Sequence, residues 1–211
     1  MTYFTADWHL GEERIGINGK PNLFYRPFTS IVQQNDTIMN NLYSVFKDGD
    51  TLWHLGDVIN GNLENAENRL KEMKNKYPNS TFNLIIGNYD EDKLDILSKY
   101  FNVHEEYVLT LTGLTYLNHY PEKCFKKNKL GLSITGHIHG LWKVQDNIIN
   151  VGVDAWHFRP VSEDEILFCY NAMQNFYDNN VFISKLREEV LQKEMDEIQN
   201  QLYRILEEEK K

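Results

Sequence analysis

The chain has 211 residues, 41% of them hydrophobic, so it can bury a core and disorder is not its default state. Its formal net charge of −9 excludes a whole-surface electrostatic grip on nucleic acid, although a local basic patch remains compatible with it. The two cysteines, Cys124 and Cys169, are too few for a disulfide framework, and a reducing compartment is expected.

Neither a secretory signal nor a membrane span is predicted. Met1 is followed at once by a short strand candidate, without a basic start or a long apolar core. No apolar run approaches the roughly 20 residues that span a bilayer. We therefore expect a cytoplasmic protein without a membrane partner.

Strands and helices alternate over the first hundred residues. Buried strands are predicted at 2–6, 50–55 and 82–86, and amphipathic helices at 31–46 and 63–76. This alternation favours right-handed crossovers and a largely parallel sheet. Sites in such sheets form beyond the carboxyl ends of the strands, where this chain places Asp7 and His9, then Asp57, then Asn88, Tyr89 and Asp90.

The pattern changes after residue 100. A hairpin is predicted from 107–111 and 114–117, and its second arm leads to His119 and a lysine-rich loop. The strand at 131–135 then runs into His137 and His139, whose imidazoles point to the same side of an extended segment.

Further short strands at 141–145 and 148–151 would complete a second, more antiparallel sheet that faces the first. Ser162 and Glu165 have the spacing of a capping box at the start of a short helix or strand.

The C-terminal part is strongly helical, and we divide the chain into a domain at 1–180 and an amphipathic helix at 181–211. The apolar seam of that helix consists of Leu191, Met195, Ile198, Leu202 and Ile205. The spacing fits a coiled-coil seam between copies of the chain, and equally a helix docked on its own domain.

Seven side chains from five segments are candidate metal ligands: Asp7, His9, Asp57, Asn88, His119, His137 and His139. They are more than one ion needs and suit two ions about 3.5–4 Å apart that share a carboxylate. Nitrogen and oxygen donors without a thiolate suit Mn, Fe, Zn or Ni.

In order and spacing, these segments resemble the five motifs of the calcineurin-like metallophosphoesterase superfamily. The motifs are Asp7-x-His9, Gly56-Asp57, Gly87-Asn88-x-Asp90, His119 and Gly136-His137-x-His139. The phrase from Asn150 to Ser162 is similar to small bacterial and phage members. The resemblance spans residues 2–160 and implies an α/β fold, a four-layer α/β/β/α sandwich of two facing mixed sheets, with the C-terminal helix as an extension.

The resemblance also implies a role for each ligand. One divalent ion, most simply Mn, would be held by Asp7, His9 and His139. The other would be held by Asn88, His119 and His137, with Asp57 bridging the two. A hydroxide between the ions would attack phosphorus in line, assisted by the catalytic set Asp57, Asn88, Tyr89 and Asp90.

Tyr89 departs from the family, which usually has a histidine here that steadies or protonates the leaving group. A phenol, with an ordinary pKa near 10, donates a hydrogen bond but is a poor general acid near neutral pH. We expect Tyr89 to orient the leaving group without being essential as an acid.

Four further residues are candidate substrate contacts. Arg159 could clamp a phosphate through two hydrogen bonds, and His157 could help the leaving group. Lys123 and Lys126 could steer an anionic substrate, although a solvated loop explains these lysines equally well.

We therefore predict a dinuclear metal-dependent hydrolase of phosphate esters, with small nucleotide-like phosphodiesters as first choice. A phosphomonoesterase or nucleotide pyrophosphatase is the alternative within enzymes, and a non-catalytic scaffold of this fold is the alternative outside them. A nuclease is weakly disfavoured, because the acidic chain has no long basic stripe for duplex nucleic acid.

Overall fold

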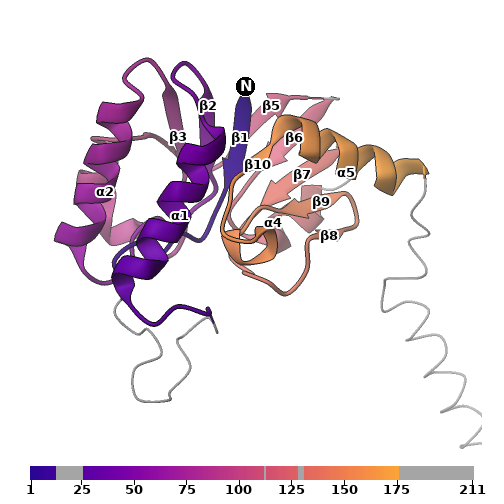
Figure 1. Ribbon diagram of the computed structural model, residues 1–211. Helices are drawn as coiled ribbons and strands as arrows, with labels where there is room; N and C mark the ends of the chain where they lie inside the picture. Colours follow the sequence, from indigo (N-terminus) through magenta and orange to yellow (C-terminus); the bar gives the residue numbers. More distant parts are fainter. Residues whose placement is uncertain (13–25, 112, 128–130, 176–211) are drawn as a thin grey trace, which may run out of the picture. The chain divides into compact units, whose positions relative to one another are not determined.

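Two five-stranded mixed sheets form the framework of residues 1–171, which make up one compact unit (Figure 1). The computed structural model describes residues 1–12, 26–111, 113–127 and 131–175. The first sheet contains β1 (Thr2–Thr5), β2 (Thr51–His54), β3 (Thr81–Ile85), β4 (Asn102–His104) and β10 (Val161–Ser162). The second contains β5 (Tyr107–Thr110), β6 (Leu114–Leu117), β7 (Leu132–Thr135), β8 (Val144–Gln145) and β9 (Ile148–Asn150).

The first sheet has the order β10-β1-β2-β3-β4, and its strands from β1 to β4 are parallel. Only β10 runs antiparallel, at the edge beside β1. The second sheet has the order β5-β6-β7-β9-β8, with a parallel centre and antiparallel strands at both edges. The predicted α/β architecture of two mixed sheets is therefore confirmed, and the second sheet is the more antiparallel one.

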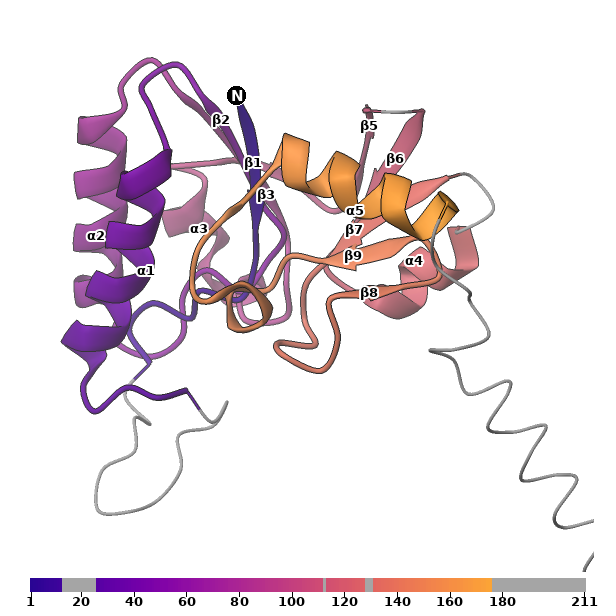
Figure 2. The same ribbon diagram turned by 45° about the vertical axis from the view of Figure 1, so that its right-hand side comes forward.

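Helices α1 (Ile31–Val45) and α2 (Leu63–Lys76) pack on the first sheet, as their apolar spacing predicts (Figure 2). Leu42 and Leu70 are fully buried against Phe82 in one cluster, and burial of such side chains contributes about 2 kcal/mol each. Both helices begin at a side-chain cap: Ser30 accepts the amide of Gln33, and Asn62 accepts that of Asn65.

A short helix, α4 (Pro121–Lys127), packs on the second sheet. Its Cys124 is buried with Tyr116 of β6 and Ile148 of β9. The prediction of a loop was therefore wrong for 121–127. Proline at the first helical position and lysines in the last turn both favour a helix here, a signal that the turn-like sequence obscures.

Several short elements were not predicted. They are β4, β10, the 3-10 helices η2 (Glu91–Lys93) and η4 (Val153–Trp156), and α3 (Leu94–Leu97). Each has two to four residues, which is too few for a hydrophobic period to emerge.

The capping box is confirmed at the start of α5 (Glu163–Asn175). The Ser162 amide donates to Glu165 Oε2 at 3.0 Å, and the Glu165 amide donates to Ser162 Oγ at 3.3 Å. The predicted helix at 181–211, with its apolar seam, lies outside the described residues. Among the described residues, no helix is long and apolar enough to cross a membrane.

His54, at the end of β2, is fully buried in the core beside the ring of Trp8, with centroids 4.5 Å apart. Neither ring nitrogen has a hydrogen-bond partner among the described residues. Burial lowers the pKa of His54 to about 3, so the folded protein keeps this imidazole neutral.

The unfolded chain binds a proton at His54 below about pH 6.5, whereas the folded protein binds it only near pH 3. Stability contributed by neutral His54 is thus present above pH 6.5 and is lost as the pH falls. We expect His54→Phe to flatten the fall in unfolding free energy between pH 6.5 and 4.5 by about 1 kcal/mol per pH unit. Urea unfolding of both proteins in chelator measures this, and equal slopes would contradict it.

Candidate metal centre

The five motif segments converge at the carboxyl ends of strands from both sheets. Beyond β1 and β2, the Asp7 amide donates to the Gly56 carbonyl at 2.9 Å and the His9 amide to the Asp57 carbonyl at 3.0 Å. The Asp7 carboxylate in turn accepts the His137 amide at 3.0 Å, which joins the first motif to the last. The two sheets therefore meet at the site itself.

Five of the seven predicted ligands have left-handed backbone conformations. Their φ values are 59° at Asp7, 48° at His9, 62° at Asp57, 74° at His137 and 51° at His139. Such conformations cost side-chain-bearing residues about 1 kcal/mol or more, and they concentrate at functional sites. Each αL residue turns the chain sharply after a strand and aims its side chain into the common space.

Glycines in these segments leave room that no side chain could share. A Cβ on Gly56 would lie 2.4 Å from His119 Nδ1, and one on Gly87 would lie 2.3 Å from Asp57 Oδ1. On Gly152 a Cβ would lie 2.5 Å from Asp7 Oδ2. The ligands therefore occupy positions that the motif glycines make available.

One cluster consists of Asp57, His119 and His137, with the Asn88 amide beside it. His119 Nε2 lies 3.2 Å from His137 Nδ1, 3.3 Å from Asn88 Oδ1 and 3.4 Å from Asp57 Oδ2. Ligand atoms around an ion with bonds of about 2.1 Å are about 3.0 Å apart in an octahedron and about 3.4 Å apart in a tetrahedron. These four atoms fit a divalent ion.

The tautomer of His119 also fits metal binding. Its Nδ1 lies 2.6 Å from the Leu55 carbonyl oxygen, to which it donates. In the neutral form of His119, Nε2 then has its lone pair toward Asp57 and Asn88, as a ligating imidazole requires.

The second cluster consists of Asp7, His9 and His139, and the imidazoles of His9 and His139 stack with centroids 5.1 Å apart. Asp57 Oδ2 lies 3.7 Å from His9 Nε2 and 3.4 Å from His119 Nε2, so one carboxylate oxygen faces both clusters. The structure thus brings all seven predicted ligands together in two groups, either of which could hold a metal ion.

The charges of the site call for a cation. Asp7 and Asp57 are almost fully buried, and burial raises the pKa of Asp7 to about 6. Burial acts against protonated His119 too, but its hydrogen bond to Asp57 and the charge of Asp7 outweigh this and raise its pKa to about 9. A proton on His119 thus takes the position that a divalent ion would occupy, and metal binding would displace it.

Asp90 fixes the backbone of the loops that carry the ligands. Its carboxylate accepts the amides of Asp57 at 2.8 Å, Val58 at 2.9 Å and Gly87 at 3.0 Å. Both oxygens are thus used to fix the loops that carry the ligands. This geometry gives Asp90 a positioning role, and its predicted catalytic role stays a prediction.

Two functional candidates escaped the sequence reasoning. Asp154 Oδ2 lies 2.7 Å from His139 Nδ1, and Arg26 forms two hydrogen bonds with Asp154. Asp154 lies in a segment that the family resemblance already pointed out. For Arg26 no local signal exists, since its partner is 128 residues away.

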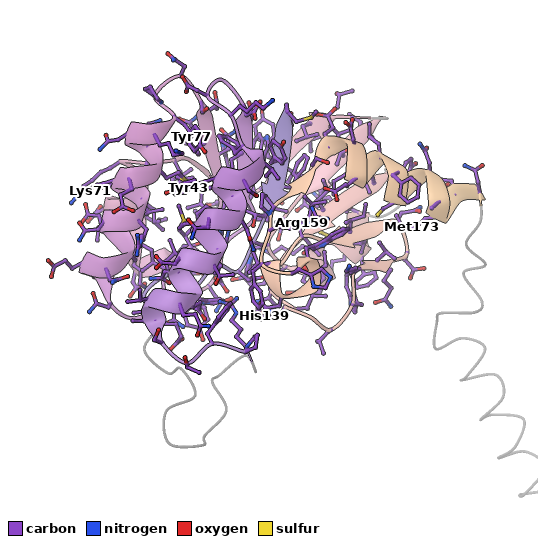
Figure 3. All side chains as sticks on the ribbon, viewed as in Figure 1. Tyr43, Lys71, Tyr77, His139, Arg159 and Met173 are labelled. Carbon is purple, nitrogen blue, oxygen red and sulfur yellow. The ribbon has the colours of Figure 1, made fainter. Side chains whose placement is uncertain are left out.

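The predicted substrate contacts are placed less uniformly. Arg159 forms an ion pair with Glu165, with hydrogen bonds of 3.0 and 2.6 Å, so a phosphate clamp would require breaking this pair. Arg159 also lies nearer to α5 than His139 does (Figure 3). His157 is exposed at the end of η4, and Lys126 is exposed on α4.

Lys123 lies closer to the clusters. Its ammonium is 4.8 Å from the ring centroid of Tyr120, which in turn packs 4.9 Å from the ring of His119. Tyr89 packs edge-on against His9 with centroids 4.9 Å apart. One tyrosine therefore flanks each cluster.

Comparison with known proteins identifies the class of enzyme to which this fold and its two ligand clusters belong. The family model described as calcineurin-like phosphoesterase matches residues 2–208, so the chain belongs to that family. Metal-dependent hydrolysis of phosphate esters is the activity that this family and the two clusters support.

Similar individual proteins are distant in sequence. An uncharacterized protein of Methanocaldococcus jannaschii is 28% identical over 67% of this chain and 78% of its own length. The gene 66 protein of Mycobacterium phage L5 is 26% identical over 78% of this chain and 91% of its own length. The crystal structure of an Aquifex aeolicus protein of unknown function matches with a TM-score of 0.62 and 28% identity, over 80% of this chain and 98% of that one.

Gly87→Ala tests the glycine requirement. The new methyl group would overlap the Asp57 carboxylate, and we expect divalent metal affinity to fall at least about tenfold. Gly140→Ala is the matched control, since its Cβ would lie 3.9 Å from the nearest atoms of Asp154. Equilibrium dialysis with metal analysis measures both. Equal affinities of the two variants would contradict the requirement for glycine at position 87.

Proposed function

We propose that this protein is a dinuclear metal-dependent phosphodiesterase that acts on small, nucleotide-like diesters. The observation that carries the proposal is the position of Asp57 Oδ2, between His9 Nε2 at 3.7 Å and His119 Nε2 at 3.4 Å. A carboxylate oxygen shared by two ligand clusters is the arrangement that two neighbouring ions require.

The candidate ligands form two groups, each of which would hold one ion. Asp7, His9 and His139 would hold one ion, and Asn88, His119 and His137 the other, with Asp57 between them. When bound, such ions act as Lewis acids that lower the pKa of water and neutralise phosphoryl oxygens. Mn²⁺ suits this nitrogen and oxygen donor set, as do Fe, Zn and Ni.

The protein itself contributes orientation. The left-handed backbone conformations of Asp7, Asp57 and His137 orient their side chains before substrate arrives, so little reorganisation would be needed during the reaction. Asn88 is exposed beside His137, with 3.1 Å between Oδ1 and Nδ1, so the cluster is open to a ligand from solvent on this side.

A cavity lies next to the ion position of Asn88, His119 and His137, since Tyr120 lines it and packs against His119, and it supports a diester as substrate. It has a volume of about 320 Å³ and is lined by Ile86, Glu91, Leu94, Glu105, Tyr120 and Lys123. Ligand pockets of this size are typical for small organic groups. With phosphorus at the metal centre, one ester substituent would reach this cavity along Tyr120, while the other would lie toward Tyr89.

Hydrolysis of bis(p-nitrophenyl) phosphate and of p-nitrophenyl phosphate tests this proposal. We expect Mn²⁺-dependent turnover with the diester preferred in kcat/KM, and loss of at least about a hundredfold in Asp57→Asn, because the shared carboxylate is removed. Chelator is the control for metal dependence. Preference for the monoester would favour a phosphomonoesterase, and bound metal without turnover of either ester would favour a scaffold.

Tyr89→Phe tests the leaving-group side. Nitrophenolate departs without protonation, so we expect turnover of the nitrophenyl diester to stay within about tenfold of the wild type. A diester with an alkyl leaving group should lose more, because the phenol hydroxyl would orient its departing oxygen. Abolished turnover of the nitrophenyl diester, with both metals retained, would show that Tyr89 is essential.

A further inference from the structure

The guanidinium of Arg26 donates hydrogen bonds around the cluster of Asp7, His9 and His139, to two backbone carbonyls and to the carboxylate of Asp154. It is buried, with 5% of Arg26 exposed. Nη1 donates to the Trp8 carbonyl at 2.9 Å, and Nη2 donates to the Asp7 carbonyl. These two carbonyls belong to the αL turn that carries Asp7 and His9.

The same guanidinium holds the carboxylate behind His139. Nε donates to Asp154 Oδ1 and Nη2 to Oδ2, both at 2.8 Å. Asp154 Oδ2 accepts Nδ1–H of His139 at 2.7 Å, which leaves Nε2 as the ligand atom. A carboxylate behind a ligating imidazole fixes its tautomer and makes it a stronger ligand.

From this geometry we propose that Arg26 and Asp154 are positioning residues that set the metal affinity of the cluster formed by Asp7, His9 and His139. This inference rests on the proposed metal centre and goes beyond it, because it separates the two ion positions. Arg26 reaches the first through two carbonyls and one carboxylate.

Two ligands of the other cluster, His119 and Asp57, are oriented by different groups. His119 donates Nδ1–H to the Leu55 carbonyl at 2.6 Å, and the Asp57 amide is held by Asp90 at 2.8 Å. Neither contact involves Arg26 or Asp154. Loss of the Arg26–Asp154 pair should therefore weaken one ion position and leave the other near its wild-type affinity.

A purely structural ion pair would behave otherwise. Breaking a buried pair destabilises a protein, but general destabilisation does not discriminate between two neighbouring ions. Arg159 and Glu165 also form a bidentate pair, at 3.0 and 2.6 Å, and no contact of this pair with a predicted ligand occurs among the described residues. Its side chains are 36 and 37% exposed, against 0 and 10% for Arg26 and Asp154, so Glu165→Gln is a control for loss of an arginine–carboxylate pair away from the site and not for loss of a buried one.

The experiment is a Mn²⁺ titration of wild type, Asp154→Asn, Arg26→Lys and Glu165→Gln, with stoichiometry by dialysis and metal analysis and with electron paramagnetic resonance of the loaded proteins. In Asp154→Asn we expect one of two ions to bind about 10–100-fold more weakly, and the signal of a coupled pair to give way to that of an isolated ion. Arg26→Lys keeps the charge but loses the planar guanidinium with its several donors, so its affinity for the weakened ion should lie between those of wild type and Asp154→Asn. Glu165→Gln should keep both ions.

Wild-type affinity for both ions in folded Asp154→Asn would overturn the inference while leaving the proposed function intact. If Asp154→Asn does not fold by circular dichroism, Arg26→Lys decides: two ions bound with wild-type affinity would overturn the inference equally. A wild-type protein that binds no divalent ion would refute the proposed function and, with it, the inference.

Discussion

The close approach of backbone segments at the carboxyl ends of the strands is the constraint on which the site depends. A Cβ would come within 2.6 Å of neighbouring atoms at Gly56, Gly87, Gly136 and Gly152. The ligands occupy the space so left, and five of them have αL backbones. Backbone strain of this kind persists only where surrounding structure enforces it. Here the parallel hydrogen bonds that continue from β1 and β2 into the ligand loops provide that enforcement.

The same crowding determines the electrostatics. Asp7, Asp57 and Asp90 are all nearly inaccessible to solvent, and burial together with the charge of Asp57 raises the pKa of Asp7 and of Asp90. Backbone amides satisfy Asp90, so its carboxylate belongs to the scaffold. Asp7 and Asp57 instead face imidazoles, and divalent ions between them would compensate their charge. Binding of ions would then stabilise the folded protein, because the unfolded chain does not assemble these ligands.

Much of this could be predicted from the sequence, because polar residues directly after buried strands meet at one edge of a parallel sheet. That rule predicts that Asp7, Asp57 and Asn88 lie together. It could not find Arg26, whose partner Asp154 lies 128 residues away and becomes a neighbour only through folding. Nor could it predict that Arg159 pairs with Glu165, since side-chain direction in a loop follows no sequence period. The short strands β4 and β10 depend on edge pairing, which leaves no pattern in two or three residues.

The two clusters differ in the groups that orient their histidines, and they therefore differ in whether a substitution can remove that support. His119 is oriented by a main-chain carbonyl, which every residue at position 55 would supply. His139 is oriented by the side chain of Asp154, which itself depends on the side chain of Arg26. A substitution can remove the second support but not the first. If each cluster holds an ion as proposed, mutation of these supporting side chains would alter the metal affinity of the cluster of Asp7, His9 and His139, whereas the orientation of His119 follows from the main chain itself.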